Sequence, residues 1–223
     1  MTFVDLSHDI HHGMVTYPGL PAPVVAEHLS RDAAEQLYGP GVTFQIGLVT
    51  MCTNTGTYID VPFHRYADGH DLAGLALERV ADQPAVLFDR RGERAISLLP
   101  GDLSGLSGHV VLVRTDHSQY FGTDRYLVDH PHLTRATAEA LVAADVACVG
   151  IDSLNIDSTA DMQRPVHSVL LAAGIPIVEH LTNLVALPHG GYRFTAVPPK
   201  IVGAGTFTVR AYATVPTVTG PAA

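Results

Sequence analysis

The sequence predicts an α/β fold: a single compact domain with a mixed sheet. Strand-like segments outnumber helical ones, and several short apolar runs end in polar residues. The chain has 223 residues, 47 % of them hydrophobic, which suits one globular domain with a substantial core. We expect this domain to cover residues 1–213. Residues 214–223 lack charge and are expected to form an extended arm or a frayed tail.

Apolar spacing along the chain predicts most of the strands. Alternation favours strands with one buried face, whereas short continuous apolar runs are typical of central strands buried on both faces. In the segment 42–52, Phe44, Ile46 and Leu48 would share one face. In chain order, the expected strands are residues 3–7, 42–52, 85–88, 109–113, 146–151, 175–179, 192–197 and 206–213.

Two segments carry helical patterns. Residues 134–144 place apolar side chains on one face, and Thr134 can cap the first turn. A second helix is expected to begin near Val166. The segments 114–116, 152–153 and 179–180 are polar and follow expected central strands, and open α/β sheets place their sites at such strand ends.

Composition excludes several classes of function. The formal net charge is -9, so an acidic surface would repel nucleic acid. Cys52 and Cys148 are too few for a disulfide scaffold, and we expect both as reduced thiols. No basic leader and no membrane-length apolar run is visible. We therefore expect a cytoplasmic protein that acts on a small molecule.

The segment 54–64 carries the most chemical information. Asp60 and His64 lie four residues apart, and Pro62 between them favours an extended loop over a helical turn. A carboxylate and an imidazole on one rigid loop can bind a metal or move protons. The alternative is that Asp60 only shapes the turn and His64 only faces solvent.

Two other histidine groups could add ligands. His167 is expected on a helix, and Glu179 ends a strand twelve residues later, with His180 next. The N-terminal histidines offer a weaker alternative metal cluster, because Asp9 is the only carboxylate in their frame. They are His8, His11 and His12.

The segment 54–64 is similar to the signature His-x-Gly-Thr-His-x-Asp-x-Pro-x-His. The matching residues are Gly56, Thr57, Asp60, Pro62 and His64. Asn54 and Tyr58 stand where the signature has its first two histidines. With further similarity running nearly end to end, the chain resembles the cyclase family of metal-dependent hydrolases, which includes bacterial kynurenine formamidase.

The resemblance implies a swivelling β/α/β arrangement, assembled as a homodimer or homotetramer. It implies that Asp60, His167 and Glu179 hold a metal and that His64 is the acid–base residue. A second family metal would need the two missing histidines. Because the remaining ligands are rich in oxygen, we expect manganese or magnesium rather than zinc, or a metal-free site.

Three functions remain open from the sequence. The first is a hydrolase of a small amide, lactone or cyclic imide. The second is a metal-independent cyclase, isomerase or dehydratase that uses Tyr58, Asn54 and His64; the third is a non-catalytic family member. The expected catalytic residues are His64, Asp60, Tyr58 and Glu179. The expected substrate-binding residues are Asn54, Phe63, Tyr120 and His180.

Overall fold

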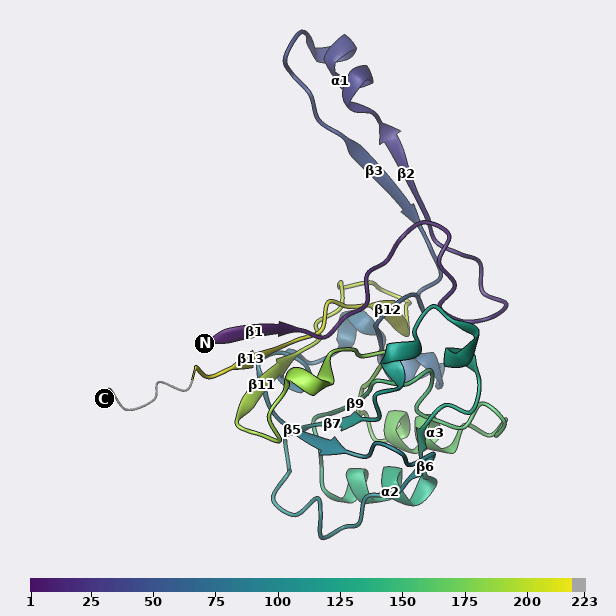
Figure 1. Cartoon of the computed structure of the whole chain (residues 1–223), viewed down its shortest axis with the longest axis vertical. Coiled ribbons are helices and arrows are strands. Elements are labelled where there is room, and N and C mark those ends of the chain that lie inside the picture. Colours follow the sequence, from purple (N-terminus) through teal and green to yellow (C-terminus); the bar gives the residue numbers. More distant parts are fainter. Residues whose placement is uncertain (218–223) are drawn as a thin grey trace, which may run out of the picture.

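A nine-stranded mixed sheet organises the described residues, 1–217, of this computed structural model (Figure 1). The four central strands pair in parallel, and the outer strands pair antiparallel. The expected mixed α/β fold is confirmed. In spatial order the strands are β1 (Thr2–Asp5), β13 (Tyr212–Val215), β11 (Tyr192–Thr195), β5 (Gln83–Asp89), β7 (Val110–Arg114), β9 (Cys148–Ile151), β10 (Ile177–Glu179), β4 (Tyr58–Asp60) and β12 (Thr206–Thr208).

The sheet is strongly curled. Strands β12 and β13 stand near opposite ends of the strand order, yet only the short segment 209–211 joins them. Hydrogen bonds cross this segment: the Val209 amide donates to Thr57 O over 2.9 Å, and the Leu6 amide donates to Ala211 O over 3.0 Å. The prediction of one strand over 206–213 was wrong, because the chain passes from one end of the curl to the other at this point.

Side-chain alternation divides the core into two layers. On β7, Val110 and Leu112 face the inside of the curl, where they join side chains from the outer strands. Val111 and Val113 face the other side and pack with the helices. All four side chains are fully buried, as expected for a central strand.

Helices α2 (Arg135–Ala143) and α3 (Pro165–Ala172) cover the second layer of the core (Figure 1). Both were expected from the sequence. Thr134 caps α2, since its hydroxyl accepts a hydrogen bond from the Thr137 amide over 3.3 Å. The short strands β6 (Ala95–Ile96) and β8 (His132–Leu133) pair outside the main sheet.

An arm projects from the body of the molecule (Figure 1). It consists of β2 (Val24–Leu29), α1 (Arg31–Tyr38) and β3 (Ile46–Thr50), with β2 and β3 forming a separate two-stranded sheet. The expected strand over 42–52 is therefore shorter than predicted and stands in the arm rather than in the core. Helix α1, capped by Ser30, was not predicted.

Within residues 1–217, six single turns of 3-10 helix connect these elements. They are η1 (Pro62–His64), η2 (Leu72–Gly74), η3 (Leu77–Arg79), η4 (His117–Tyr120), η5 (Asp124–Leu127) and η6 (Leu184–Ala186). Both cysteines are free thiols, as expected. No helix among residues 1–217 is long and apolar enough to cross a membrane. The expected C-terminal arm or tail begins inside β13, which runs through Val215; residues 218–223 lie outside the described part of the chain.

Candidate active site

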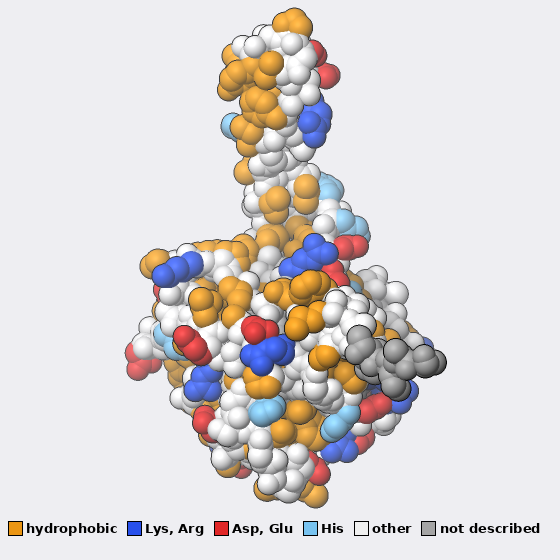
Figure 2. All heavy atoms as spheres, turned by 90° about the vertical axis from the view of Figure 1, so that its left-hand side faces the viewer, with side chains coloured by type: hydrophobic (Ala, Val, Ile, Leu, Met, Phe, Trp, Pro, Cys, Tyr) orange, Lys and Arg blue, Asp and Glu red, His pale blue; other side chains and the backbone are white. Residues whose placement is uncertain are grey.

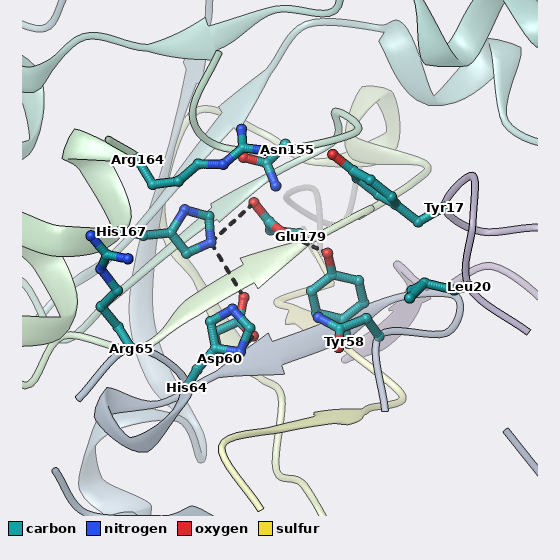
Figure 3. Close-up of a pocket in the computed structure, with 11 residues that line it drawn as sticks. Tyr17, Leu20, Tyr58, Asp60, His64, Arg65, Asn155, Arg164, His167 and Glu179 are labelled. Carbon is teal, nitrogen blue, oxygen red and sulfur yellow. Dashed lines mark hydrogen bonds and ion pairs between the residues drawn. The ribbon is translucent and has the colours of Figure 1, made fainter. Parts of the chain in front are cut away.

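A cavity of about 350 Å³ opens beside the ends of β4 and β10 (Figure 3). Residues from five separate parts of the chain line it. They are Tyr17, Leu20, Asn54, Tyr58, Asp60, His64, Arg65, Asn155, Arg164, His167 and Glu179. The structure therefore brings together all the expected metal ligands, all the expected catalytic residues and Asn54.

Strand β4 and the turn η1 set the floor of the cavity. Tyr58 and Asp60 are two residues apart on β4, so their side chains share one face, while Ile59 packs into the core. Pro62 begins the 3-10 turn η1 instead of extending the loop, which corrects the prediction. Proline suits this first helical position because its missing N–H has no partner there. The turn brings His64 Nδ1 to 3.6 Å from Asp60 Oδ1.

His167 Nε2 faces two carboxylates at the centre of the cavity (Figure 3). His167 Nε2 lies 3.6 Å from Asp60 Oδ2 and 3.7 Å from Glu179 Oε1. Two atoms each about 2.1 Å from one ion lie roughly 3.0 Å apart as neighbours in an octahedron and roughly 3.4 Å apart in a tetrahedron, so this spacing is close to that of shared ligands. Asp60 Oδ2 is buried and has no hydrogen-bond partner. Asp60 and His167 thus present two atoms that fit a divalent cation, and Glu179 faces the same imidazole nitrogen from a position that is not within 4.8 Å of both. His64 also places a ring nitrogen within 4.8 Å of ligand atoms of Asp60 and His167, as an alternative third ligand.

Asp157 orients His167 and was not anticipated from the sequence. Its Oδ2 lies 2.7 Å from His167 Nδ1 and also accepts the His167 amide over 3.0 Å. Its Oδ1 accepts the Val166 amide over 2.7 Å, so Asp157 also caps α3. Because a carboxylate only accepts, Nδ1 carries a proton in either protonation state, so the lone pair that a metal requires becomes available on Nε2 once that nitrogen gives up its proton.

The ionisation of the site also favours a cation. Burial opposes the charge on His167, but Glu179, Asp157 and Asp60 outweigh it and raise the His167 pKa to about 10. Burial likewise opposes ionisation of Asp60, yet His167, His64 and Thr206 keep the Asp60 pKa below its usual range. For Glu179, burial dominates over His167 and raises the pKa to about 7. Three carboxylates thus surround one imidazole, a buried excess of negative charge that a metal ion would balance.

Thr206 links Asp60 to His64. Its hydroxyl donates to Asp60 Oδ1 and lies 2.8 Å from His64 Nδ1. Because the single hydroxyl proton goes to the carboxylate, a neutral His64 must donate from Nδ1, which leaves Nε2 free to accept a proton. Gly205 permits this approach: a Cβ there would lie 2.6 Å from His64 Cα. A threonine 142 residues from His64 gives no signal in the sequence.

Tyr58 donates a hydrogen bond to Glu179 in this structure. The Tyr58 hydroxyl donates to Glu179 Oε2 over 2.6 Å, and the Ile156 amide donates to Glu179 Oε1 over 2.5 Å. Burial and the Glu179 charge raise the Tyr58 pKa well above its ordinary value, so the phenol stays neutral. Where the family signature has a second histidine, this chain therefore has a neutral donor that fixes the orientation of the Glu179 carboxylate.

Three residues expected to bind substrate do not line this cavity. His180 is fully buried behind Tyr58, and its Nδ1 lies 2.9 Å from the Tyr126 hydroxyl. The Tyr120 ring packs against the Arg125 guanidinium, whose Cζ lies 3.8 Å from the centroid of the Tyr120 ring. Phe63 is absent from the lining as well. Conversely, Tyr17, Arg65, Asn155 and Arg164 line the cavity and were not predicted, because no local motif marks them.

The N-terminal histidines do not form a site. His8 stacks on Phe121 with 3.7 Å between ring centroids, and His12 Nδ1 accepts the Val25 amide over 3.3 Å. Among the described residues, the group of His, Cys, Asp and Glu side chains close enough to share an ion is Asp60, His64 and His167. The hypothesis of a metal site at the N-terminal histidines therefore has no support from the geometry.

Comparison with known proteins agrees with this geometry. The Cyclase family model matches residues 4–158, more than half of the chain. The chain belongs to the cyclase family. Its similarity to family members extends beyond the matched segment: the kynurenine formamidase of Salinibacter ruber is 29 % identical over 214 residues, which cover 95 % of this chain and 96 % of that protein. The kynurenine formamidase of Maricaulis maris is 28 % identical over 210 residues, covering 93 % and 95 %.

Solved structures of the cyclase family share this fold. A structure described as a potential metal-dependent hydrolase with cyclase activity is 25 % identical, with a TM-score of 0.76 and coverage of 95 % of this chain and 96 % of that one. Isatin hydrolase A from Ralstonia solanacearum superposes with a TM-score of 0.80 at 23 % identity, covering 96 % and 92 %. The expected membership of a hydrolase family and the expected fold are both confirmed.

Proposed function

We propose that this protein hydrolyses the C–N or C–O bond of a small amide, lactone or cyclic imide with the help of one divalent metal. The single observation that carries the proposal is Asp60 Oδ2, a buried carboxylate oxygen that has no hydrogen-bond partner and faces His167 Nε2 at 3.6 Å. An isolated buried charge costs several kcal/mol unless a cation or a donor meets it. The names of the relatives support an amide substrate, since kynurenine formamidases and isatin hydrolases recur among them.

Asp60, His167 and Glu179 would hold the metal. When bound, a divalent cation supplies Lewis acidity toward a carbonyl oxygen and lowers the pKa of a water molecule. Manganese or magnesium suits this oxygen-rich set better than zinc, because only one imidazole remains among the three ligands. Tyr58 keeps Glu179 in place, and Asp157 keeps His167 in the ligating tautomer.

His64 would transfer the protons. With Nδ1 donating to Thr206, neutral His64 presents Nε2 as a base that can take a proton from an attacking water. The same imidazole can then return the proton to the departing nitrogen or oxygen. His64 is partly exposed at the cavity, with 37 % of its side chain accessible, so a substrate can reach it.

The metal-free alternative has less support from the geometry. In that mechanism Tyr58 would donate to a substrate oxygen, whereas its proton is directed to Glu179. The test is turnover of small amides, lactones and imides by purified protein, with and without a chelator. Activity lost on chelation and restored by Mn²⁺ is the expected result; activity that survives complete removal of metal would overturn the proposal in favour of the alternative.

We also propose that the chain is a homodimer or homotetramer assembled through the arm. Hydrophobic side chains gather along the arm (Figure 2), and an isolated two-stranded sheet is at best marginally stable in water. The exposed apolar side chains of the arm are Val24, Val25, Leu37, Tyr38, Val42, Ile46, Leu48 and Val49.

Sedimentation at micromolar concentration tests this assembly. We expect an oligomer for the native chain and dissociation for Leu48→Glu, which puts a charge on an apolar surface of the arm. A native chain that sediments only as a monomer would contradict the proposal. A cytoplasmic location and the absence of nucleic-acid and membrane partners remain predictions from composition.

A further inference from the structure

Two arginines stand at one side of the cavity, and the proposed hydrolysis does not use them. Arg65 follows His64 at the end of the turn η1, and Arg164 immediately precedes α3. Figure 3 shows the two guanidinium groups on either side of His167, with that of Arg164 beside Asn155. Segments 99 residues apart along the chain thus bring two positive charges to the lining of one cavity.

Neither arginine is neutralised by the protein. Arg65 donates from one Nη to Gln163 O over 3.4 Å, and Arg164 donates from one Nη to Ser158 O over 3.0 Å. Within residues 1–217, neither guanidinium lies within 4.0 Å of a carboxylate oxygen, although most of the other arginines form such pairs. A guanidinium has five N–H donors, so each of these two keeps donors for a ligand.

Asn155 adds a third donor beside Arg164 (Figure 3). Its Oδ1 accepts the Asp157 amide over 3.0 Å, which fixes the amide group and directs Nδ2 away from that bond. Asn155 is 9 % exposed, so its position is set by the surrounding chain. The amides at the start of α3 are already bound by Asp157 and are not available to a ligand.

The opposite wall of the cavity is different in character. Tyr17 and Leu20 lie across the site from Arg65, with Leu20 beyond Tyr58 and the Tyr17 hydroxyl turned toward Asn155 (Figure 3). Both come from the segment that leads into the arm. His167, Asp60 and Glu179 lie between Arg65 and this apolar side of the cavity (Figure 3).

We infer that Arg65, Arg164 and Asn155 form a subsite for a carboxylate group of the substrate. The inference rests on the proposed function and names its substrate class: a small acyl compound that carries both an apolar or aromatic group and a carboxylate close to the scissile bond. Arginine suits this task because its planar fork pairs with both oxygens of a carboxylate. Two positive charges at the site also counter the long-range repulsion of an anion by a chain of net charge -9.

The test compares a charged and a neutral probe on the Mn²⁺-loaded protein. The probes are 2-formamidobenzoate and its methyl ester, which differ in the carboxylate charge. We expect Arg65→Gln and Arg164→Gln each to lower the ratio of kcat/KM for the acid over that for the ester by about 10- to 100-fold, the effect of one charge-assisted hydrogen bond. Arg135→Gln on α2 is the matched control, since it removes the same charge far from the cavity and should leave the ratio unchanged.

A binding measurement separates this inference from the hydrolase proposal. Fluorescence titration with 2-aminobenzoate, against neutral 2-aminobenzamide, requires no turnover. Preferential binding of the acid that is lost in both arginine variants, with neither formamide hydrolysed, would sustain the subsite and contradict the hydrolase. Equal binding of the two probes, or a kcat/KM ratio unaltered by both substitutions, would overturn the inference.

Discussion

Asp157→Asn should remove the metal by reversing the tautomer of His167. In the native chain the Asp157 carboxylate accepts three hydrogen bonds, of 2.7, 3.0 and 2.7 Å, from the Val166 amide, the His167 amide and His167 Nδ1. Asparagine has one accepting oxygen and one NH₂ group. If its oxygen stays with the Val166 amide, the NH₂ faces the imidazole, and His167 can accept from it only by moving its proton to Nε2.

The expected loss of metal affinity follows from the two carboxylate oxygens that His167 Nε2 faces. A proton on Nε2 would point at Asp60 Oδ2 and Glu179 Oε1, 3.6 and 3.7 Å away, where the ion would bind. Loss of such a carboxylate–histidine contact typically weakens metal affinity by about 10- to 100-fold, or roughly 1.4 to 2.7 kcal/mol. The loss of buried charge-assisted hydrogen bonds should also lower the free energy of unfolding, by about 1–3 kcal/mol.

Chelator-buffered Mn²⁺ titration of the metal-stripped protein measures the affinity, and thermal unfolding confirms that the variant is folded. Asp68→Asn is the charge-matched control, because Asp68 is exposed and its side chain makes no hydrogen bond or ion pair within residues 1–217. We expect its affinity to stay within about twofold of the native value, as for a surface site. A folded Asp157→Asn protein that binds Mn²⁺ as tightly as the native chain would refute the argument from the tautomer.

Three further predictions concern the site and the fold. His64→Asn should lower kcat by about 10²- to 10⁴-fold with metal content unchanged, because asparagine keeps polarity but cannot transfer a proton; near-native turnover would refute the role. Asn54→His combined with Tyr58→His should raise zinc affinity in equilibrium dialysis, since it restores two nitrogen ligands; an unchanged zinc affinity would show that the loop does not present them. The free energy of unfolding, measured by urea titration, should fall as the pH is lowered from about 6.5 toward 4. The fall should reach up to about 1.4 kcal/mol per pH unit for each histidine that stays neutral in the folded chain and is protonated on unfolding. A free energy of unfolding that does not change over this pH range would contradict the prediction. Burial lowers the pKa of three such histidines, to about 4, 4 and 3, namely His8, His130 and His180.

Hydrophobic patterning along the sequence is enough to predict the central strands and both core helices. These elements are buried on defined faces, so burial leaves a periodic signal in the chain. The segment 42–52 shows where that signal misleads. Its alternation is real, but the arm leaves those apolar side chains exposed, and periodicity alone does not state what covers a face.

The site divides in the same way. Asp60, His64, His167 and Glu179 could be found from the sequence, because they carry the chemistry and fall in a short motif and a spaced pair. The side chains that orient these four residues could not be found from the sequence. Asp157 is a common residue type in an ordinary polar loop, and nothing in the sequence indicates that it meets His167.

The tertiary structure alone decided how these groups work together. Thr206 reaches Asp60 across 146 residues, because the curled sheet pairs β12 with β4. Arg65 and Arg164 face the same cavity only because the turn η1 lies beside the start of α3. The sequence thus determined which functional side chains are present, since their chemistry belongs to the individual residue. Protonation, orientation and charge balance depend on distances of a few ångströms between remote segments, and only the folded chain sets those distances.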